Sequence, residues 1–128
     1  MRASVLVLAL AGCLVACGGN DPADPMRTGA TCPPASTLTY ETFGAPFMES
    51  YCTRCHATDV VGADRHGAPT DHNFDTLDGI LAEAEHVDAY AAAGPDATNT
   101  IMPPAGDAPS DEERLQLGEW LACETAGQ

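Results

Sequence analysis

One short segment, Cys52-Thr53-Arg54-Cys55-His56, constrains this chain more than any other feature of its sequence. It places two thiols and an imidazole within five residues of a 128-residue chain, which is long enough for one small domain but not for two. Aromatic residues make up only 5% of the chain, so an unaided hydrophobic core would be thin. A buried cofactor would add the missing apolar bulk, and a disulfide would add stability.

The Cys-x-x-Cys-His spacing is typical of covalent haem attachment. In that chemistry the two thiols add to the haem vinyl groups, and the adjacent imidazole is held beneath the iron as a ligand. Two other kinds of site remain open. A zinc site needs a second pair of ligands, which His66 and His72 could provide. A thioredoxin-like redox pair is expected in a βαβ context, and we find no convincing strand pattern.

The first residues have the pattern of a secretory signal, with one positive charge followed by an apolar run at residues 5–11 that is too short to span a bilayer. The run Leu14-Val15-Ala16-Cys17 resembles the lipobox of bacterial lipoproteins. That resemblance implies export, removal of residues 1–16 and lipidation of Cys17. Gly18 after that cysteine favours the outer membrane, with the protein facing the periplasm. The alternative is an ordinary signal with a coincidental cysteine.

The six cysteines can each be assigned a role. Cys13 leaves with the signal, Cys17 takes the lipid, and Cys52 and Cys55 belong to the attachment motif. Cys32 and Cys123 remain, and two leftover thiols in an oxidising compartment usually pair. We therefore expect a Cys32–Cys123 disulfide, with two free thiols or an intermolecular bridge as the alternative.

Composition divides the mature chain into a tether and a domain. Residues 17–36, a lipidated N-terminus followed by a stretch rich in Gly, Pro, Asp and Ala, show no apolar period and are expected to be flexible. Residues 37–128 are expected to form the domain. Its first predicted helix covers residues 43–54, with Thr42 as the N-cap and Pro46 tolerated in the first turn.

The second predicted helix has the clearest periodicity. Apolar residues recur on one helical face from Leu77 to Ala91. Asp75 would cap its start, and Gly94-Pro95 would end it.

The third predicted helix opens with a capping box formed by Ser110 and Glu113. Its apolar stripe consists of Leu117, Trp120 and Leu121. Residues 57–74 and 95–109 are expected to be loops. With no convincing strand, the domain is predicted to be all-α.

The domain from Thr39 to Cys123 resembles the class I c-type cytochromes. The attachment motif is the most specific mark. Gly44 stands eight residues before the motif, where that family often has glycine for close contact with its last helix, and Trp120 matches the family's aromatic at that crossing. Met48 departs from the aromatic that the family often has four residues before the motif. The resemblance implies a small domain of three to four helices around one covalent haem c.

The resemblance also implies the second axial ligand of the iron, opposite His56. Met102 and the two prolines after it look like the family's Met-Pro loop, and the prolines would stiffen that loop. His66 and His72 are alternatives, as is an open position. His86 lies opposite the apolar face of the second helix and is expected to face solvent.

An iron with both axial positions filled cannot bind a substrate, so the resemblance implies a single-electron carrier at a bacterial membrane and no enzyme activity. A haem-based sensor or a peroxidase-like protein is the alternative. The net charge is -14, and removal of Arg2 with the signal leaves four arginines against 19 acids, a charge of -15. This charge repels nucleic acid and favours redox partners with a basic docking surface, unless it serves only solubility. We expect a monomer.

Overall fold

The computed structural model describes residues 25–127, so the signal segment and Cys17 lie outside the described residues. The described chain folds into α1 (Ala45–Tyr51), α2 (Leu77–Ala82), α3 (Ala84–Ala91) and α4 (Asp111–Thr125). One turn of π-helix (Tyr40–Gly44) precedes α1, and a 3-10 turn (Gly62–Arg65) lies in the following loop. The β pairing found within this range is one isolated bridge, between Ala93 and Thr98. The predicted all-α class is confirmed.

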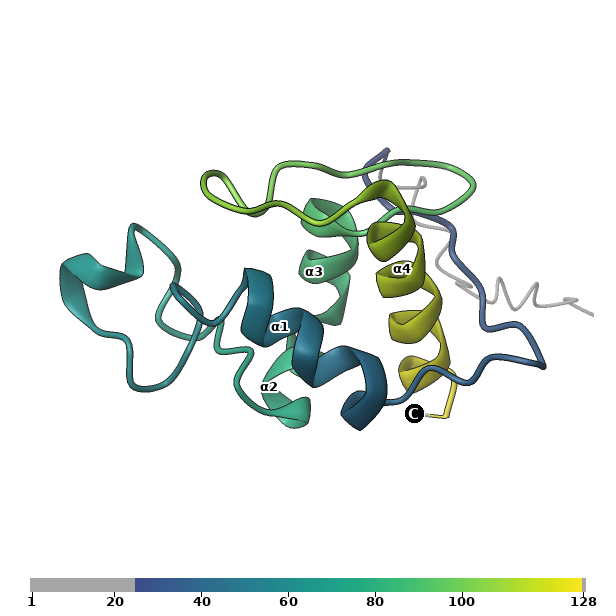
Figure 1. Ribbon diagram of the computed structural model, residues 1–128, viewed down its shortest axis with the longest axis horizontal. Coiled ribbons are helices and arrows are strands. Elements are labelled where there is room, and N and C mark those ends of the chain that lie inside the picture. The colour runs from purple at the N-terminus through teal and green to yellow at the C-terminus, as the bar shows by residue number, and fades with distance from the viewer. Residues whose placement is uncertain (1–24, 128) are drawn as a thin grey trace, which may run out of the picture.

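The helix α4 stands beside α3, and α1 crosses in front of them (Figure 1). The predicted capping box is present, since Ser110 Oγ accepts the Glu113 N–H and the Glu113 carboxylate accepts the Ser110 N–H. The predicted stripe on α4 is buried. Side chains from the other helices and one loop complete the core around it, among them Phe47, Met48, Phe74, Ile80 and Val87.

The contact between Gly44 and Trp120 is as close as the family resemblance implied. A Cβ at Gly44 would lie 2.3 Å from Trp120 Cζ2, far inside van der Waals distance. The indole is fully buried, and its Nε1–H donates to Glu124 at 2.9 Å. Only glycine therefore allows the segment before α1 to pack on α4 in this way.

The start of the first helix differs from the prediction by a few residues. Thr39, and not Thr42, is the N-cap, and the two threonines form a capping box with each other. Pro46 lies in the first turn of α1, as predicted. The helix ends at Tyr51, three residues before the predicted end.

The second predicted helix is broken in two. Glu83 has a non-helical backbone (φ -119°, ψ 21°) and separates α2 from α3. Its carboxylate contacts His72 and His86, and His72 lies outside the helix, so the apolar periodicity contained no sign of the break. The helix also ends at Ala91, before the predicted Gly94-Pro95 stop.

The predicted cap of that helix was also wrong. Thr76 is the N-cap, because its Oγ1 accepts the Gly79 N–H at 3.1 Å. The Asp75 carboxylate instead accepts the N–H and the hydroxyl of Thr58 in the preceding loop.

The tether is shorter than predicted. Thr28, inside the predicted 17–36 segment, is only 1% exposed, and its N–H and hydroxyl both donate to the Asp88 carboxylate on α3. The predicted disulfide is present, joining Cys32 to Cys123 with their Cα atoms 4.6 Å apart. The folded domain therefore begins no later than Thr28, not at residue 37.

Within residues 25–127, none of the helices combines the length and the apolar character needed to span a membrane.

Replacing Gly44 with alanine should destabilise the domain, because the new methyl group would force α1 and α4 apart. We expect Gly44→Ala to lower the free energy of unfolding by about 1–3 kcal/mol in urea titrations. Glu49→Ala, at an exposed site on α1, is the control and should change it by less than about 0.5 kcal/mol. Equal stability of Gly44→Ala and the parent would contradict the close contact.

Candidate functional site

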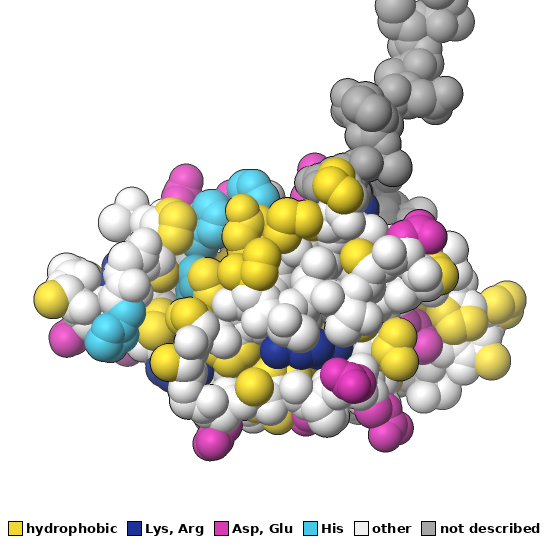
Figure 2. Space-filling model, turned by 90° about the horizontal axis from the view of Figure 1, so that it is seen from above, with side chains coloured by type: hydrophobic (Ala, Val, Ile, Leu, Met, Phe, Trp, Pro, Cys, Tyr) yellow, Lys and Arg dark blue, Asp and Glu magenta, His cyan; other side chains and the backbone are white. Residues whose placement is uncertain are grey.

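The predicted ligand residues converge on one pocket of about 330 Å³. The motif follows the C-terminal end of α1 and lines this pocket with Cys52, Cys55 and His56. Met102 and its two prolines line it from the loop between α3 and α4. Figure 2 shows histidine and hydrophobic side chains gathered on the face viewed from above, with acidic side chains mostly near its edges.

The His56 ring is held in one orientation. Its Nδ1 lies 3.1 Å from the His72 carbonyl oxygen, to which it donates, and the ring stacks on Phe74 with centroids 4.8 Å apart. Burial lowers the pKa of His56, and the Arg65 and His72 charges act in the same direction, against the hydrogen bond to the carbonyl. The imidazole is therefore neutral at pH 7 with its proton on Nδ1, which leaves the Nε2 lone pair for a metal.

The motif cysteines are not bonded to each other or to other cysteines. Burial raises the pKa of the Cys52 thiol to about 12, although Arg54 and Arg114 act in the opposite direction. A redox-active Cys-x-x-Cys pair needs a lowered thiol pKa, so the environment of Cys52 disfavours the thioredoxin-like alternative. Among residues 25–127 no cluster of metal-ligating groups joins these thiols to histidines, which disfavours the zinc alternative.

Met102 is fixed at both of its backbone groups. Its N–H donates to the Tyr90 carbonyl on α3 at 2.9 Å, and its carbonyl accepts from Arg114 Nη1 at 3.0 Å. Arg114, on α4, is 3% exposed and donates also to the carbonyls of Ala91 and Asn99. The loop that carries Met102 is thus tied to two helices.

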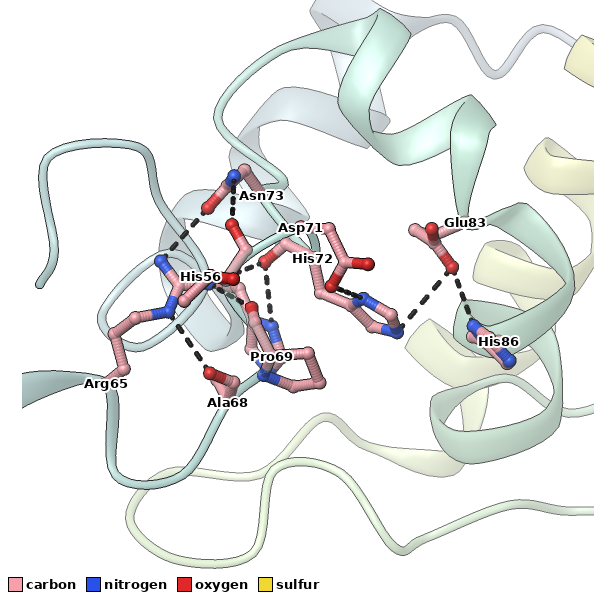
Figure 3. Close-up of polar contacts among 10 residues, drawn as sticks. His56, Arg65, Ala68, Pro69, Asp71, His72, Asn73, Glu83 and His86 are labelled. Atoms are coloured by element: carbon pink, nitrogen blue, oxygen red, sulfur yellow. Dashed lines mark hydrogen bonds and ion pairs between the residues drawn. The ribbon is translucent and has the colours of Figure 1, made fainter. Parts of the chain in front are cut away.

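Arg65 organises the opposite loop and was not predicted as a site residue. It is 5% exposed. Its guanidinium donates to the Ala57 and Ala68 carbonyls and to the Asn73 side-chain oxygen (Figure 3). The His72 carbonyl accepts both from Arg65 Nη2 at 3.1 Å and from His56 Nδ1. Arg65 therefore positions the acceptor that orients His56. No sequence signal marks it, since it stands in a polar loop with no apolar pattern.

The remaining histidines have different surroundings. His66 is exposed and adopts a left-handed conformation (φ 51°) after the 3-10 turn. His86 has 60% of its side chain exposed, as predicted, although it also borders the pocket. His72 has both ring nitrogens engaged, Nδ1 with Asp71 at 3.0 Å and Nε2 with Glu83 at 3.5 Å.

A scan against protein-family models, a search of curated proteins and a search of solved structures each found no match to this chain.

The Cys52 thiol should react slowly with alkylating agents before any cofactor is attached. A thiol with a folded-state pKa of about 12 stays protonated well above pH 9.0, the ordinary value, and the thiolate is the reactive form. We expect the rate of iodoacetamide labelling at Cys52, followed by mass spectrometry, to rise steeply only as pH approaches 12.

The unfolded chain in urea is the control, and its Cys52 should reach half-maximal labelling rate near pH 9. Rapid labelling of folded Cys52 at pH 7 would contradict the raised pKa of its thiol.

Proposed function

We propose that this protein is a monohaem c-type cytochrome that relays single electrons at a bacterial membrane. The observation that carries the proposal is the convergence of Cys52, Cys55, His56 and Met102 on one pocket. They come from two parts of the chain, the attachment motif and the loop before α4, and together they supply two thiols, an imidazole and a thioether.

The residues present fit a covalent haem. Cys52 and Cys55 would form the thioether bonds to the haem, and His56 Nε2 and Met102 sulfur would bind its iron. When bound, haem supplies an iron that gains or loses one electron at a time. The chain's own part is to orient His56 through the His72 carbonyl and to hold the Met102 backbone against α3 and α4.

Hydrogen bonding favours Met102 over His72 as the second ligand. The His72 carbonyl binds His56 Nδ1, so the backbone of His72 lies behind the ring that would bind the iron. Its imidazole is engaged by Asp71 and Glu83. Met102 carries neither restriction and lies partly buried against the core.

Two protein ligands, His56 and Met102, would leave the iron no position for a substrate, which favours electron transfer over catalysis. A peroxidase needs an open position on the iron with an acid or base beside it, and the proposed Met102 ligand would fill that position. A haem-based sensor would differ by exchange of the Met102 ligand, which the first experiment below detects.

The anchor and the partners belong to the same proposal. Cys17 would carry the lipid that holds the domain at the membrane, with the outer membrane favoured and the domain facing the periplasm. The mature charge of -15 would favour basic redox proteins as partners.

Loss of the Met102 thioether should change the visible spectrum of the haem-loaded protein. We expect Met102→Ala to abolish the long-wavelength band of Fe–Met bonding in the oxidised state, to lower the reduction potential and to admit CO to the reduced iron. His72→Ala is the matched control, because it keeps the backbone carbonyl that binds His56.

The band should persist in His72→Ala. Absence of the band from the parent protein, with a haem spectrum changed by His72→Ala and unchanged by Met102→Ala, would assign the ligand to His72. The absence of covalently bound haem after denaturation would overturn the cytochrome proposal itself.

Electron exchange with a basic partner should depend strongly on salt. Opposite charges raise the rate of encounter, and salt screens them over about 10 Å at 0.1 M. We expect the second-order rate constant with a cationic redox protein to fall as ionic strength rises, and that with an anionic protein to increase. Stopped-flow absorbance measures both. A rate with the cationic partner that is independent of salt would contradict steering by charge.

A further inference from the structure

A second group of ligand side chains lies at the rim of the pocket and has no part in the proposed electron transfer. His72, Glu83 and His86 bring one ligand atom each to within 4.8 Å of one another. Figure 3 shows the Glu83 carboxylate between the two imidazoles. One of its oxygens lies 3.5 Å from His72 Nε2 and 2.6 Å from His86 Nδ1.

The backbone places these groups together from three segments. Glu83 occupies the break between α2 and α3, and His86 lies one turn further along α3. His72 comes from the preceding loop, where its carbonyl is fixed by Arg65. Glu83 and His86 are three residues apart, a spacing that puts side chains on the same face of a helix, and His72 reaches the same carboxylate from the loop.

His72 also has the partner that metal-binding histidines commonly have. Its Nδ1 lies 3.0 Å from the Asp71 carboxylate and donates to it, so the neutral ring has its lone pair on Nε2. Such a carboxylate–histidine pair both orients the ring and strengthens Nε2 as a ligand. In the metal-free protein Nε2 pairs with Glu83 at 3.5 Å, and an ion bound between the two would replace the proton of that pair.

The spacing suits a small transition-metal ion. Metal–ligand bonds of about 2.0–2.1 Å place the ligand atoms of a tetrahedral ion about 3.3 Å apart. The two separations from Glu83, 2.6 and 3.5 Å, lie on either side of that value, and all three ligand atoms lie within 4.8 Å of one another, so side-chain rotations can bring them to one ion. His72 and Glu83 have 19% and 20% of their side chains exposed, and His86 has 60%, which leaves a path for an ion.

We propose that His72, Glu83 and His86 bind one divalent transition-metal ion of the Zn²⁺ or Cu²⁺ class. Two imidazoles and a carboxylate are ligands that such ions favour, and three protein ligands leave one position for water. The site needs neither haem nor the Met102 ligand, so it stands or falls separately from the proposed electron transfer.

Calorimetric titration of the metal-stripped, exported protein with ZnCl₂ tests the site. We expect one Zn²⁺ per chain, with the affinity lowered at least about tenfold in His86→Ala and in Glu83→Gln, and about tenfold in Asp71→Asn through the orientation of His72. Glu85→Gln is the matched control, since it removes the same charge from an exposed site on α3, where the carboxylate pairs with exposed Arg27. It should leave the affinity within about twofold.

Cu²⁺ gives a second, independent readout. The electron paramagnetic resonance spectrum of the copper-loaded protein should show hyperfine coupling to two imidazole nitrogens, and His72→Ala or His86→Ala should reduce this to one. Absence of Zn²⁺ binding, equal weakening by Glu85→Gln and Glu83→Gln, or copper coupling unchanged in both histidine variants would overturn the proposal. Circular dichroism of each variant establishes that a lost affinity is not a lost fold.

Discussion

Two buried arginines hold the loops on which the candidate site depends. Arg65 binds the carbonyls of the loop that follows the attachment motif, and Arg114 binds those at the end of α3 and in the Met102 loop. Irregular loops leave carbonyls without partners, and burying them unpaired is costly. Each guanidinium supplies several donors in a rigid plane, so one side chain satisfies acceptors that no helix or sheet could reach.

Neither arginine forms an ion pair with a carboxylate within residues 25–127. A buried charge is tolerated here because carbonyl dipoles surround it, and the chain's net charge of -14 favours a cation wherever it lies. The two arginines also act on the two proposed ligands in the same way, through the backbone. Arg65 reaches the carbonyl that orients His56, and Arg114 reaches the carbonyl of Met102.

The parts of the fold that follow from local patterns were predictable. The Ser110 capping box, the buried stripe of α4 and the Cys32–Cys123 bridge all rest on nearby residues or on a small set of candidates. The wrong N-caps were local errors of a few residues, whereas the larger misses come from distant partners. The break at Glu83 and the burial of Thr28 depend on contacts with His72 and Asp88 that no periodicity records. The burial of Arg65 and Arg114 was not predicted, because arginine side chains are usually exposed.

The N-terminal segment determines how a membrane anchor would be coupled to the domain. The chain beyond residue 24 docks on α3 through Thr28 and is bonded to the end of α4 through Cys32, so any force transmitted from Cys17 would reach the last two helices first. This segment runs beside α4, whereas the loop after the attachment motif projects at the opposite end of the domain (Figure 1). A haem held by that motif would therefore lie towards the end remote from the anchored segment. Thr28, the docked residue, lies 11 residues after Cys17, whereas the predicted tether extended to residue 36, so a lipid at Cys17 would give the domain a shorter reach from a membrane than composition suggested.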